Sequence, residues 1–218
     1  MRDTFHSELN ELREQLAAMC ELAAEAMRRS GEAVRTADRE LAAGVVDGDE
    51  VLDKARDRCD EHAQSLLALQ APVAGDLRMV LAAVYCADKI ERMGDLAAHV
   101  ADAVRRHETG RPVPAELAET FAELGAVTAG MADRLVTLVR EPSADGFAEL
   151  HRTDHKVDEL HASVLAAITG PDWEHGVRCG TGLALLARFY ERYGDQAVSV
   201  AKRLAFAATG ETPRLARS

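Results

Sequence analysis

The stretch ADKIERMGDLAAHV, residues 87–100, is followed one hundred positions later by ARFYERYGDQAVSV, residues 187–200. At that offset, the identities over residues 87–110 and 187–210 fall at Ala87, Glu91, Arg92, Gly94, Asp95, Ala97, Val100, Ala101, Thr109 and Gly110. Chance would give roughly two or three such identities in an alanine-rich window. We therefore infer an internal repeat of about a hundred residues.

The composition of the chain favours a helical protein. Hydrophobic residues make up 47% of the 218 residues and aromatic residues only 4%, with 15 glycines and 6 prolines. So few aromatic and turn-forming residues leave little material for a β-rich fold and suit helices rich in alanine and leucine. We expect an all-α fold, built as a tandem repeat of two three-helix bundles.

Apolar residues spaced three to four apart predict the individual helices. We expect Ser30-Gly31 to interrupt the first helix, the turn at 47–49 to open a new one, and Gly110 to cap the helix before it. The predicted helices span about 4–29 (with a shorter helix to 46), 50–69, 76–107, 115–139, 143–168 and 174–208. The bundles are expected at 1–110 and 115–210, each with one broken or kinked arm, with a linker at 111–114 and a disordered tail at 211–218.

The charge of the chain limits its partners. A formal net charge of −11 disfavours binding to nucleic acid or anionic lipid, because both reward clustered lysine and arginine. Cations and basic protein surfaces are better partners for an acidic chain. The N-terminal segment MRDTFHSELNEL is charged throughout, unlike a signal peptide, and no apolar run is long enough to span a bilayer. We expect a cytoplasmic protein without direct membrane insertion.

The repeated motif carries two acids on one helix face. Glu91 and Asp95 lie four residues apart, as do Glu191 and Asp195, and like charges at that spacing repel. A glycine inside a helix costs a further ~1 kcal/mol relative to alanine. Two interpretations remain open: the acids hold a metal ion, for which carboxylate oxygens suit Mg, Mn or Fe, or they lie on a solvated face in ordinary ion pairs.

A metal site of this kind needs a second helix to supply further oxygens. In the second half, Asp154 and Asp158 are again four apart. In the first half, Arg56 stands where the matching acid is expected, which leaves Asp60 with Asp57 as a displaced substitute. His151 and His155 also form an H-x-x-x-H pair, which fits either zinc or an exposed helix face.

Other chemistry finds little support in the sequence. The chain has neither a phosphate-binding G-x-x-x-x-G-K-[ST] loop nor a G-x-S-x-G nucleophile motif. Cys20, Cys59, Cys86 and Cys179 are scattered without a C-x-x-C pair, and we expect them to be reduced residues that fill the core. We predict that the protein is not an enzyme. The alternatives are a carboxylate-bridged metalloenzyme and a purely structural dimerisation module.

Residues 66–101, LLALQAPVAGDLRMVLAAVYCADKIERMGDLAAHVA, together with residues 187–211, ARFYERYGDQAVSVAKRLAFAATGE, resemble the PhoU family of bacterial phosphate-signalling proteins. The resemblance implies a tandem of two three-helix bundles and a cytosolic regulator of phosphate uptake without catalysis of its own. It implies two partners, the ATPase subunit of the phosphate ABC transporter and a membrane sensor histidine kinase. When phosphate is plentiful, such a protein represses the phosphate-starvation genes, and we expect a homodimer.

Some family members bind multinuclear iron or zinc clusters through paired acids. By position, this implies Glu91 and Asp95 in the first repeat and Glu191 and Asp195 in the second. The acids of the neighbouring helix fall on Asp154 and Asp158 in the second half, and on Asp60, with Asp57 beside it, in the first. Arg56 departs from the family pattern, so a complete cluster in the first bundle is doubtful.

Overall fold

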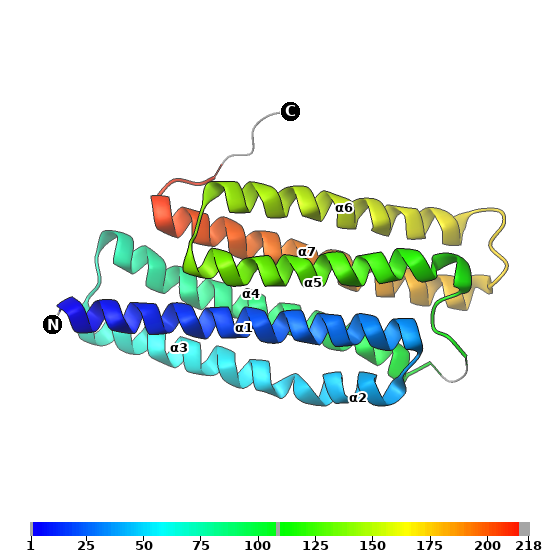
Figure 1. Ribbon diagram of the computed structural model, residues 1–218, viewed down its shortest axis with the longest axis horizontal. Helices are drawn as coiled ribbons and strands as arrows, with labels where there is room; N and C mark the ends of the chain where they lie inside the picture. The colour runs from blue at the N-terminus through cyan, green and yellow to red at the C-terminus, as the bar shows by residue number, and fades with distance from the viewer. Residues whose placement is uncertain (1, 108–109, 214–218) are drawn as a thin grey trace.

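Figure 1 shows the computed structural model of the chain, which describes residues 2–107 and 110–213. Within these ranges every regular element is a helix, which confirms the expected all-α class. The elements are α1 (Arg2–Thr36), α2 (Arg39–Gly48), α3 (Glu50–Gln70), α4 (Ala74–Arg105), the 3-10 helix η1 (Ala115–Leu117), α5 (Ala118–Arg140), α6 (Ala144–Thr169) and α7 (Gly176–Thr209). No helix in the described part of the chain is long and apolar enough to cross a membrane.

The two repeats pack against each other along their full length. Helix α1 lies along α5 and α4 along α7, so these four helices form the centre of the molecule. The α2–α3 arm covers α1 and α4 on one long side, and α6 covers the opposite side (Figure 1). Apolar side chains of both repeats join in one core, which includes Leu16, Ile90 and Leu124. The predicted pair of three-helix units is therefore confirmed, whereas their boundaries at 1–110 and 115–210 stay a prediction.

Ion pairs along the seam between the repeats show that α1 and α5 run antiparallel. Arg28 near the end of α1 contacts Asp133 of α5 at 2.9 Å. Closer to the start of α1, Glu14 accepts from Arg140 at 2.8 Å. These pairs are exposed and stabilise the fold by at most ~1 kcal/mol each, so the apolar core supplies most of the cohesion.

Helix α1 continues through Ser30 and Gly31, so the predicted interruption at these residues is wrong. Ser30 is fully buried, and its Oγ lies 2.8 Å from the carbonyl oxygens of both Ala26 and Ala97. These oxygens satisfy the hydroxyl without breaking the helix. Gly31 serves a close approach of α5, because a Cβ built there would lie 3.6 Å from the Cα atom of Gly125. Both residues therefore serve packing between helices.

The break after α1 comes at Ala37, whose backbone has a left-handed φ of 57°. The next residue, Asp38, caps α2: its carboxylate accepts from the backbone N–H groups of Glu40 at 3.0 Å and Leu41 at 2.9 Å. Such a cap satisfies two of the free N–H groups at a helix start and is worth about 1 kcal/mol. The sequence analysis missed this cap, because Ser30-Gly31 is a stronger helix-breaking signal in the sequence.

Asp49 joins α2 to α3 and marks the broken arm of the first repeat. It is the N-cap of α3, yet its backbone is helical (φ −60°, ψ −37°) and its side chain makes no capping hydrogen bond. The carboxylate is therefore available for contacts outside its own helix. In the second repeat, α6 runs without a break, so the broken arm predicted for each repeat occurs only in the first one among the described residues.

The remaining helix ends follow from proline and glycine. Pro72 disfavours a helical residue before it, and Ala71 accordingly ends α3 with a φ of 44°. Gly210 caps α7 in the left-handed region at φ 77°, as expected of a C-terminal glycine. Helix α4 ends at Arg105, so the prediction that Gly110 caps it is wrong. The predicted disordered tail falls largely on residues 214–218, outside the described residues.

The cysteines bear out their predicted role in part. Cys20, Cys59 and Cys86 are fully buried in the core and unpaired. Burial raises the pKa of each of these thiols, which keeps them protonated and unreactive. Cys179 is free as well but only partly buried.

Candidate functional site

Four acids gather where α6 meets α7, and we call them the second cluster: Asp154 and Asp158 of α6 with Glu191 and Asp195 of α7. Burial raises the pKa of Asp154 to about 7, and the charges of the other three members add to the rise. Burial likewise raises the pKa values of Glu191 and Asp195. All four predicted acids of the second repeat therefore act on one another electrostatically.

Gly194 lets this cluster form. A Cβ built on Gly194 would lie 2.5 Å from Oδ1 of Asp154, closer than any real side-chain contact. The carboxylate of Asp154 thus lies directly against the backbone of α7, between Glu191 and Asp195 in sequence. This close approach explains why a helix would tolerate glycine at this position despite its cost of ~1 kcal/mol.

Glu191 has one oxygen satisfied and one left over. Arg188, one turn earlier on α7, pairs with Oε1 of Glu191 and lowers its pKa against the effect of burial. The Oε2 atom is buried without a hydrogen-bond partner, and the side chain as a whole is only 12% exposed. A buried carboxylate oxygen without a partner costs free energy, so this atom is a natural ligand for a cation.

The first repeat has an equivalent group, which we call the first cluster: Asp49 and Asp53 on the α2–α3 arm with Glu91 and Asp95 of α4. Burial raises the pKa of Asp49 to about 6, and the charges of Asp95 and Asp53 add to it. Burial and the charge of Asp95 raise the pKa of Glu91, and Asp53 adds to the effect. The side chain of Asp95 also accepts from Arg92 at 2.5 Å.

Asp49 and Asp53 were missed in the sequence analysis. It aligned Asp154 with Arg56, two helical turns further along α3. In the structure, a Cβ on Gly94 would lie 3.3 Å from Oδ1 of Asp49, as one on Gly194 meets Asp154. Asp49 escaped notice because an aspartate before a helix indicates a capping residue.

The paired acids support this alignment of the two arms. Burial agrees with both alignments, because they differ by seven residues: this one pairs Leu52 with Val157 and Cys59 with Val164, the first pairs Cys59 with Val157 and Leu66 with Val164, and all of these side chains are buried. Asp49 and Asp53 then correspond to Asp154 and Asp158, and both pairs have the spacing of four. The signal that would have found them is the pair of acids itself, since the first alignment places Arg56 opposite Asp154 and only Asp60 opposite Asp158.

The two other acids predicted on α3 lie apart from the first cluster. Asp57 is exposed and pairs with Arg56 at 3.1 Å. Burial raises the pKa of Asp60, with Asp57 and Asp88 adding to the rise and Arg56 opposing it. These acids therefore surround the guanidinium of Arg56 rather than Gly94. Metal binding by any of the predicted acids stays a prediction.

The histidines of α6 border the second cluster. His151 and His155 contact each other edge to face, with ring centroids 4.6 Å apart. Nδ1 of His155 lies 3.9 Å from Oδ2 of Asp158. His161 has its pKa lowered by burial and by Arg188, so it is a neutral donor beside the acids. These residues offer nitrogen ligands next to the carboxylates, and zinc binding by His151 and His155 stays a hypothesis.

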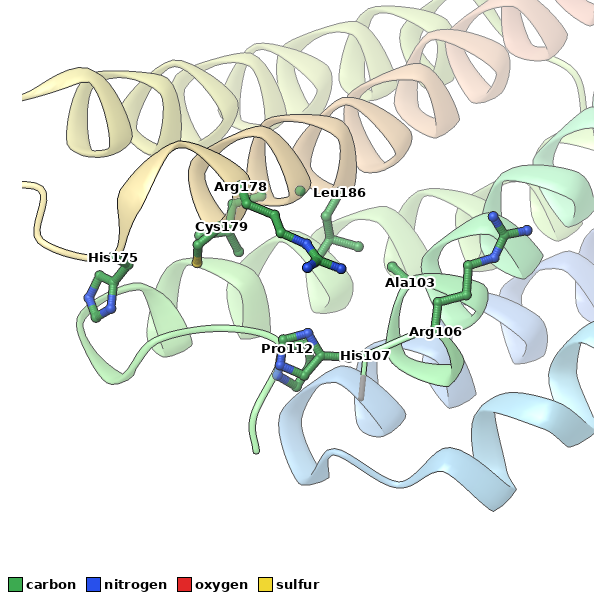
Figure 2. Close-up of a pocket in the computed structure, with 10 residues that line it drawn as sticks. Ala103, Arg106, His107, Pro112, His175, Arg178, Cys179 and Leu186 are labelled. Atoms are coloured by element: carbon green, nitrogen blue, oxygen red, sulfur yellow. The ribbon is translucent and has the colours of Figure 1, made fainter. Parts of the chain in front are cut away.

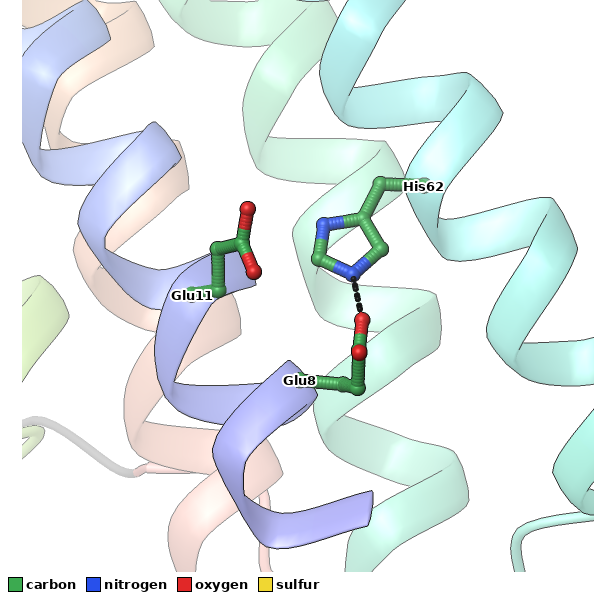
Figure 3. Close-up of side chains that lie close together, drawn as sticks. All are labelled: Glu8, Glu11 and His62. Carbon is green, nitrogen blue, oxygen red and sulfur yellow. Dashed lines mark hydrogen bonds and ion pairs between the residues drawn. The ribbon is translucent and has the colours of Figure 1, made fainter. Parts of the chain in front are cut away.

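A separate group of ligating side chains joins α1 to α3. One ligand atom from each of Glu8, Glu11 and His62 lies within 4.8 Å of the other two (Figure 3). None of the predicted metal ligands belongs to this group. The sequence analysis missed it because the three residues share no motif.

Figure 2 shows a pocket of about 450 Å³ between the end of α4 and the start of α7. It is lined by Ala103, Arg106, His107, Pro112, His175, Arg178, Cys179, Gly182, Leu183 and Leu186. None of the clustered acids reaches this pocket. Burial raises the pKa of the Cys179 thiol, and the charge of Glu116 adds to it, which is the opposite of what an activated cysteine nucleophile needs.

Comparisons with known proteins recognise both repeats of the chain. The family model described as the PhoU domain matches residues 16–104 and 121–204, one match in each repeat. The chain is 42% identical over 215 residues to the phosphate-specific transport system accessory protein PhoU homolog 1 of Mycobacterium leprae, covering 98% of this chain and 96% of that protein. It is 40% identical over 213 residues to homolog 2 of Mycobacterium tuberculosis, covering 98% of this chain and 100% of the relative.

Two solved structures share the fold. The crystal structure of the phosphate transport system regulatory protein PhoU from Streptococcus pneumoniae superposes with a TM-score of 0.87 at 24% identity, covering 97% of this chain and 100% of the other. The structure of PhoU from Pseudomonas aeruginosa gives a TM-score of 0.83 at 22% identity, covering 95% and 100%. With the family model matched in both repeats and relatives of 40% and 42% identity over nearly the whole chain, this protein is a member of the PhoU family.

Proposed function

We propose that this protein is a regulator of phosphate uptake and phosphate-starvation signalling that acts by binding other proteins and has no catalytic activity. Membership of the family and the names of the mycobacterial relatives support the link to phosphate transport. The names of these relatives as accessory proteins of a transport system also support a non-catalytic role. When phosphate is plentiful, the protein represses the phosphate-starvation genes.

The partners we propose are the ATPase subunit of the phosphate ABC transporter and a sensor histidine kinase. The observation that carries this proposal is the pair of acidic clusters, one beside α3 and one beside α6. These two helices flank opposite long sides of the bundle, so the clusters can serve two basic surfaces at once (Figure 1). The net charge of −11 favours rapid encounter with such surfaces. The adapter acts in the cytoplasm, and we propose a homodimer.

The second cluster also fits a metal ion, and we propose a multinuclear iron or zinc centre there. Glu191 has a buried oxygen without a partner, and the pKa values of Glu191 and Asp195 are raised although Arg188, and at Asp195 also Arg192, opposes the rise. The ligands would be Asp154, Asp158, Glu191 and Asp195. Bound cations would neutralise the repulsion among the acids and tie α6 to α7.

The first cluster is less suited to a metal centre. Arg56 of α3 already opposes the rise in the pKa of Glu91, and Arg92 pairs with Asp95. These two arginines already supply part of the positive charge that a bound metal ion would bring. We propose that the first cluster serves mainly for docking, with metal secondary.

Gene disruption with complementation tests the regulatory role. Loss of the gene should derepress a phosphate-starvation reporter in phosphate-rich medium, and the wild-type gene should restore repression. A variant with Glu191→Gln and Asp195→Asn should restore it poorly. Glu159→Gln, which changes an exposed acid of α6 next to the cluster, is the matched control and should restore it fully. An unchanged reporter after disruption would contradict the proposed function.

A further inference from the structure

Glu8, Glu11 and His62 form a group of metal-ligating side chains apart from both acidic clusters. Glu8 and Glu11 lie one turn apart near the start of α1, and His62 lies near the end of α3 (Figure 3). The first cluster uses the other end of the same arm, at Asp49 and Asp53. Nine residues of helix separate Asp53 from His62, or roughly 13 Å at 1.5 Å per residue. The group therefore cannot share ligands with the first cluster.

The imidazole of His62 is held in a fixed orientation. Its Nδ1 lies 3.2 Å from Oε1 of Gln15, and its Nε2 lies 2.9 Å from Oε2 of Glu8. The ring is largely buried between α1 and α3, with 14% of the side chain exposed. A second polar group that holds one ring nitrogen and directs the other toward a ligand position is a recurrent arrangement at protein metal sites.

The position of the Glu11 carboxylate beside His62 is not explained by a hydrogen bond to the ring. Glu8 and Gln15 already contact the two ring nitrogens, yet the carboxylate of Glu11 also lies beside the ring (Figure 3). Among the described side chains, no lysine or arginine nitrogen comes within 4.0 Å of Glu8 or Glu11, and His62 is the partner of Glu8. Two carboxylates thus meet at one imidazole without a lysine or arginine between them.

We propose that Glu8, Glu11 and His62 bind one divalent transition-metal ion, with Zn²⁺ as the fitting ion. One nitrogen and two carboxylate oxygens are an accepted ligand set for Zn²⁺. Ligand atoms around a tetrahedral Zn²⁺ lie about 3.4 Å apart, given bonds of about 2.1 Å. The three atoms here lie within 4.8 Å of one another, and the glutamates sit on flexible and partly exposed side chains that can close the difference.

The ion would join α1 to α3 and keep one coordination position for water, because the chain supplies three ligands. Glu8 and Glu11 precede residue 16, where the match to the PhoU domain begins. Two of the three ligands therefore lie outside the region by which the family is recognised, while His62 lies inside it, and the site does not depend on the proposed regulatory function.

Zn²⁺ binding by the full-length chain tests the site. Two acids of each cluster are first neutralised (Glu91→Gln, Asp95→Asn, Glu191→Gln and Asp195→Asn), and circular dichroism checks the fold. Equilibrium dialysis of this chain against Zn²⁺ should give one bound ion. Adding His62→Gln should weaken binding at least tenfold, and adding Glu11→Gln should weaken it several-fold. His6→Gln and Glu61→Gln change exposed neighbours outside the group and should leave the affinity unchanged.

The Glu11→Gln variant separates a metal site from a hydrogen-bonded pair, because the contacts of His62 to Glu8 and Gln15 do not involve it. An affinity in the Glu11→Gln or the His62→Gln chain equal to that of the starting chain, or no ion bound to the starting chain, would overturn the proposal. If the neutralised chain does not fold, the wild-type chain is loaded with Co²⁺ instead. The visible absorption bands of a nitrogen-ligated Co²⁺ should then lose one component in His62→Gln and keep it in His6→Gln, and unchanged bands in His62→Gln would overturn the proposal as well.

Discussion

The two acidic clusters occupy equivalent places in the two repeats, yet the glycine in each one leaves room for a different kind of side chain. Gly194 makes room for the carboxylate of Asp154, whereas Gly94 makes room first for the methyl group of Leu52, at 2.4 Å from a built Cβ, and then for Asp49. The same residue in the same helix position thus admits a charged group in one repeat and mainly an apolar one in the other. The repeated glycine leaves the same space on α4 and α7, and the residue on the facing helix, Leu52 in one repeat and Asp154 in the other, determines which side chain occupies it.

The cation beside each cluster differs as well. In the first cluster, Arg56 of α3 lowers the pKa of Glu91 while Asp88 of α4 raises it. In the second, the position of Asp88 is taken by Arg188 of α7, which lowers the pKa of Glu191. The arginine that compensates the repeated glutamate thus lies on the flanking helix in the first cluster and on the central helix in the second. Beside the repeated aspartate the two clusters agree, because Arg92 pairs with Asp95 and Arg192 lowers the pKa of Asp195.

The largest effect that sharpens this comparison is expected in metal content. A chain with Glu191→Gln and Asp195→Asn should lose at least ~100-fold in affinity for iron or zinc at the second cluster, because two ligands are removed. The matched pair Glu91→Gln and Asp95→Asn should cost far less. Elemental analysis of protein purified without a chelator or metal-affinity tag checks both. Equal losses from the two pairs would remove the distinction between the clusters.

Stability against pH gives the next largest effect. The pKa of Asp154 is raised from 3.8 to about 7 in the folded protein, so the folded state keeps this proton where the unfolded chain has lost it. The stability from this group is complete below about pH 4 and is lost as the pH rises to about 7. Asp154→Asn removes that loss, so relative to its effect at pH 4 it should raise the free energy of unfolding of the metal-free protein at pH 8 by roughly 1–2 kcal/mol. The gain is smaller than the pKa shift of Asp154 alone implies, because neighbouring acids share the proton.

The corresponding change in the first cluster should be smaller. The pKa of Asp49 rises from 3.8 only to about 6, so Asp49→Asn should gain less between pH 4 and pH 8 than Asp154→Asn. Urea unfolding at several pH values, with a chelator present, measures both variants. A larger gain for Asp49→Asn would contradict the order of the pKa shifts of Asp49 and Asp154.

The glycines should respond differently to alanine. At Gly94 the new methyl group meets Leu52, which is 4% exposed and has little room to move. Gly94→Ala should therefore destabilise the fold by about 1–2 kcal/mol even after the gain in helix propensity. At Gly194 the carboxylate of Asp154 can turn outward, so Gly194→Ala should stay within about 1 kcal/mol of the wild type while disturbing the second cluster. Thermal unfolding distinguishes the two, and a stable Gly94→Ala variant would contradict the contact with Leu52.

The smallest effect separates the two alignments of α3. Asp53→Asn removes a charge that raises the pKa values of both Asp49 and Glu91, so both should titrate at lower pH in this variant. Asp57→Asn changes an exposed acid that affects Asp60, and it should leave the titration of Asp49 and Glu91 unchanged within a few tenths of a unit. Carboxyl NMR titration follows each group. A shift at Glu91 in Asp57→Asn but not in Asp53→Asn would restore the first alignment.

The sequence predicted the elements that depend on local pattern. The all-α class, the repeat and the four acids of α4 and α7 follow from apolar spacing and from residue identities at a fixed offset. The break near Ala37 and the role of Asp49 could not be predicted in this way. Both depend on tertiary contacts. The hydroxyl of Ser30 donates to a carbonyl oxygen of α4, and the carboxylate of Asp49, at the start of α3, lies beside Gly94 of α4. The group around His62 was out of reach for the same reason, since α1 and α3 meet only in the folded chain.

The seam between the repeats has a consequence for the origin of the chain. Helix α1 packs on its own counterpart α5, and α4 on its counterpart α7, as surfaces do across a two-fold axis in a symmetric dimer. The linker around residues 111–114 therefore joins what has the geometry of two subunits. The protein thus has the arrangement of a two-fold symmetric dimer whose two subunits are linked in one polypeptide. Because the two halves are separate stretches of one chain, charged residues can be substituted in one half without the same change in the other.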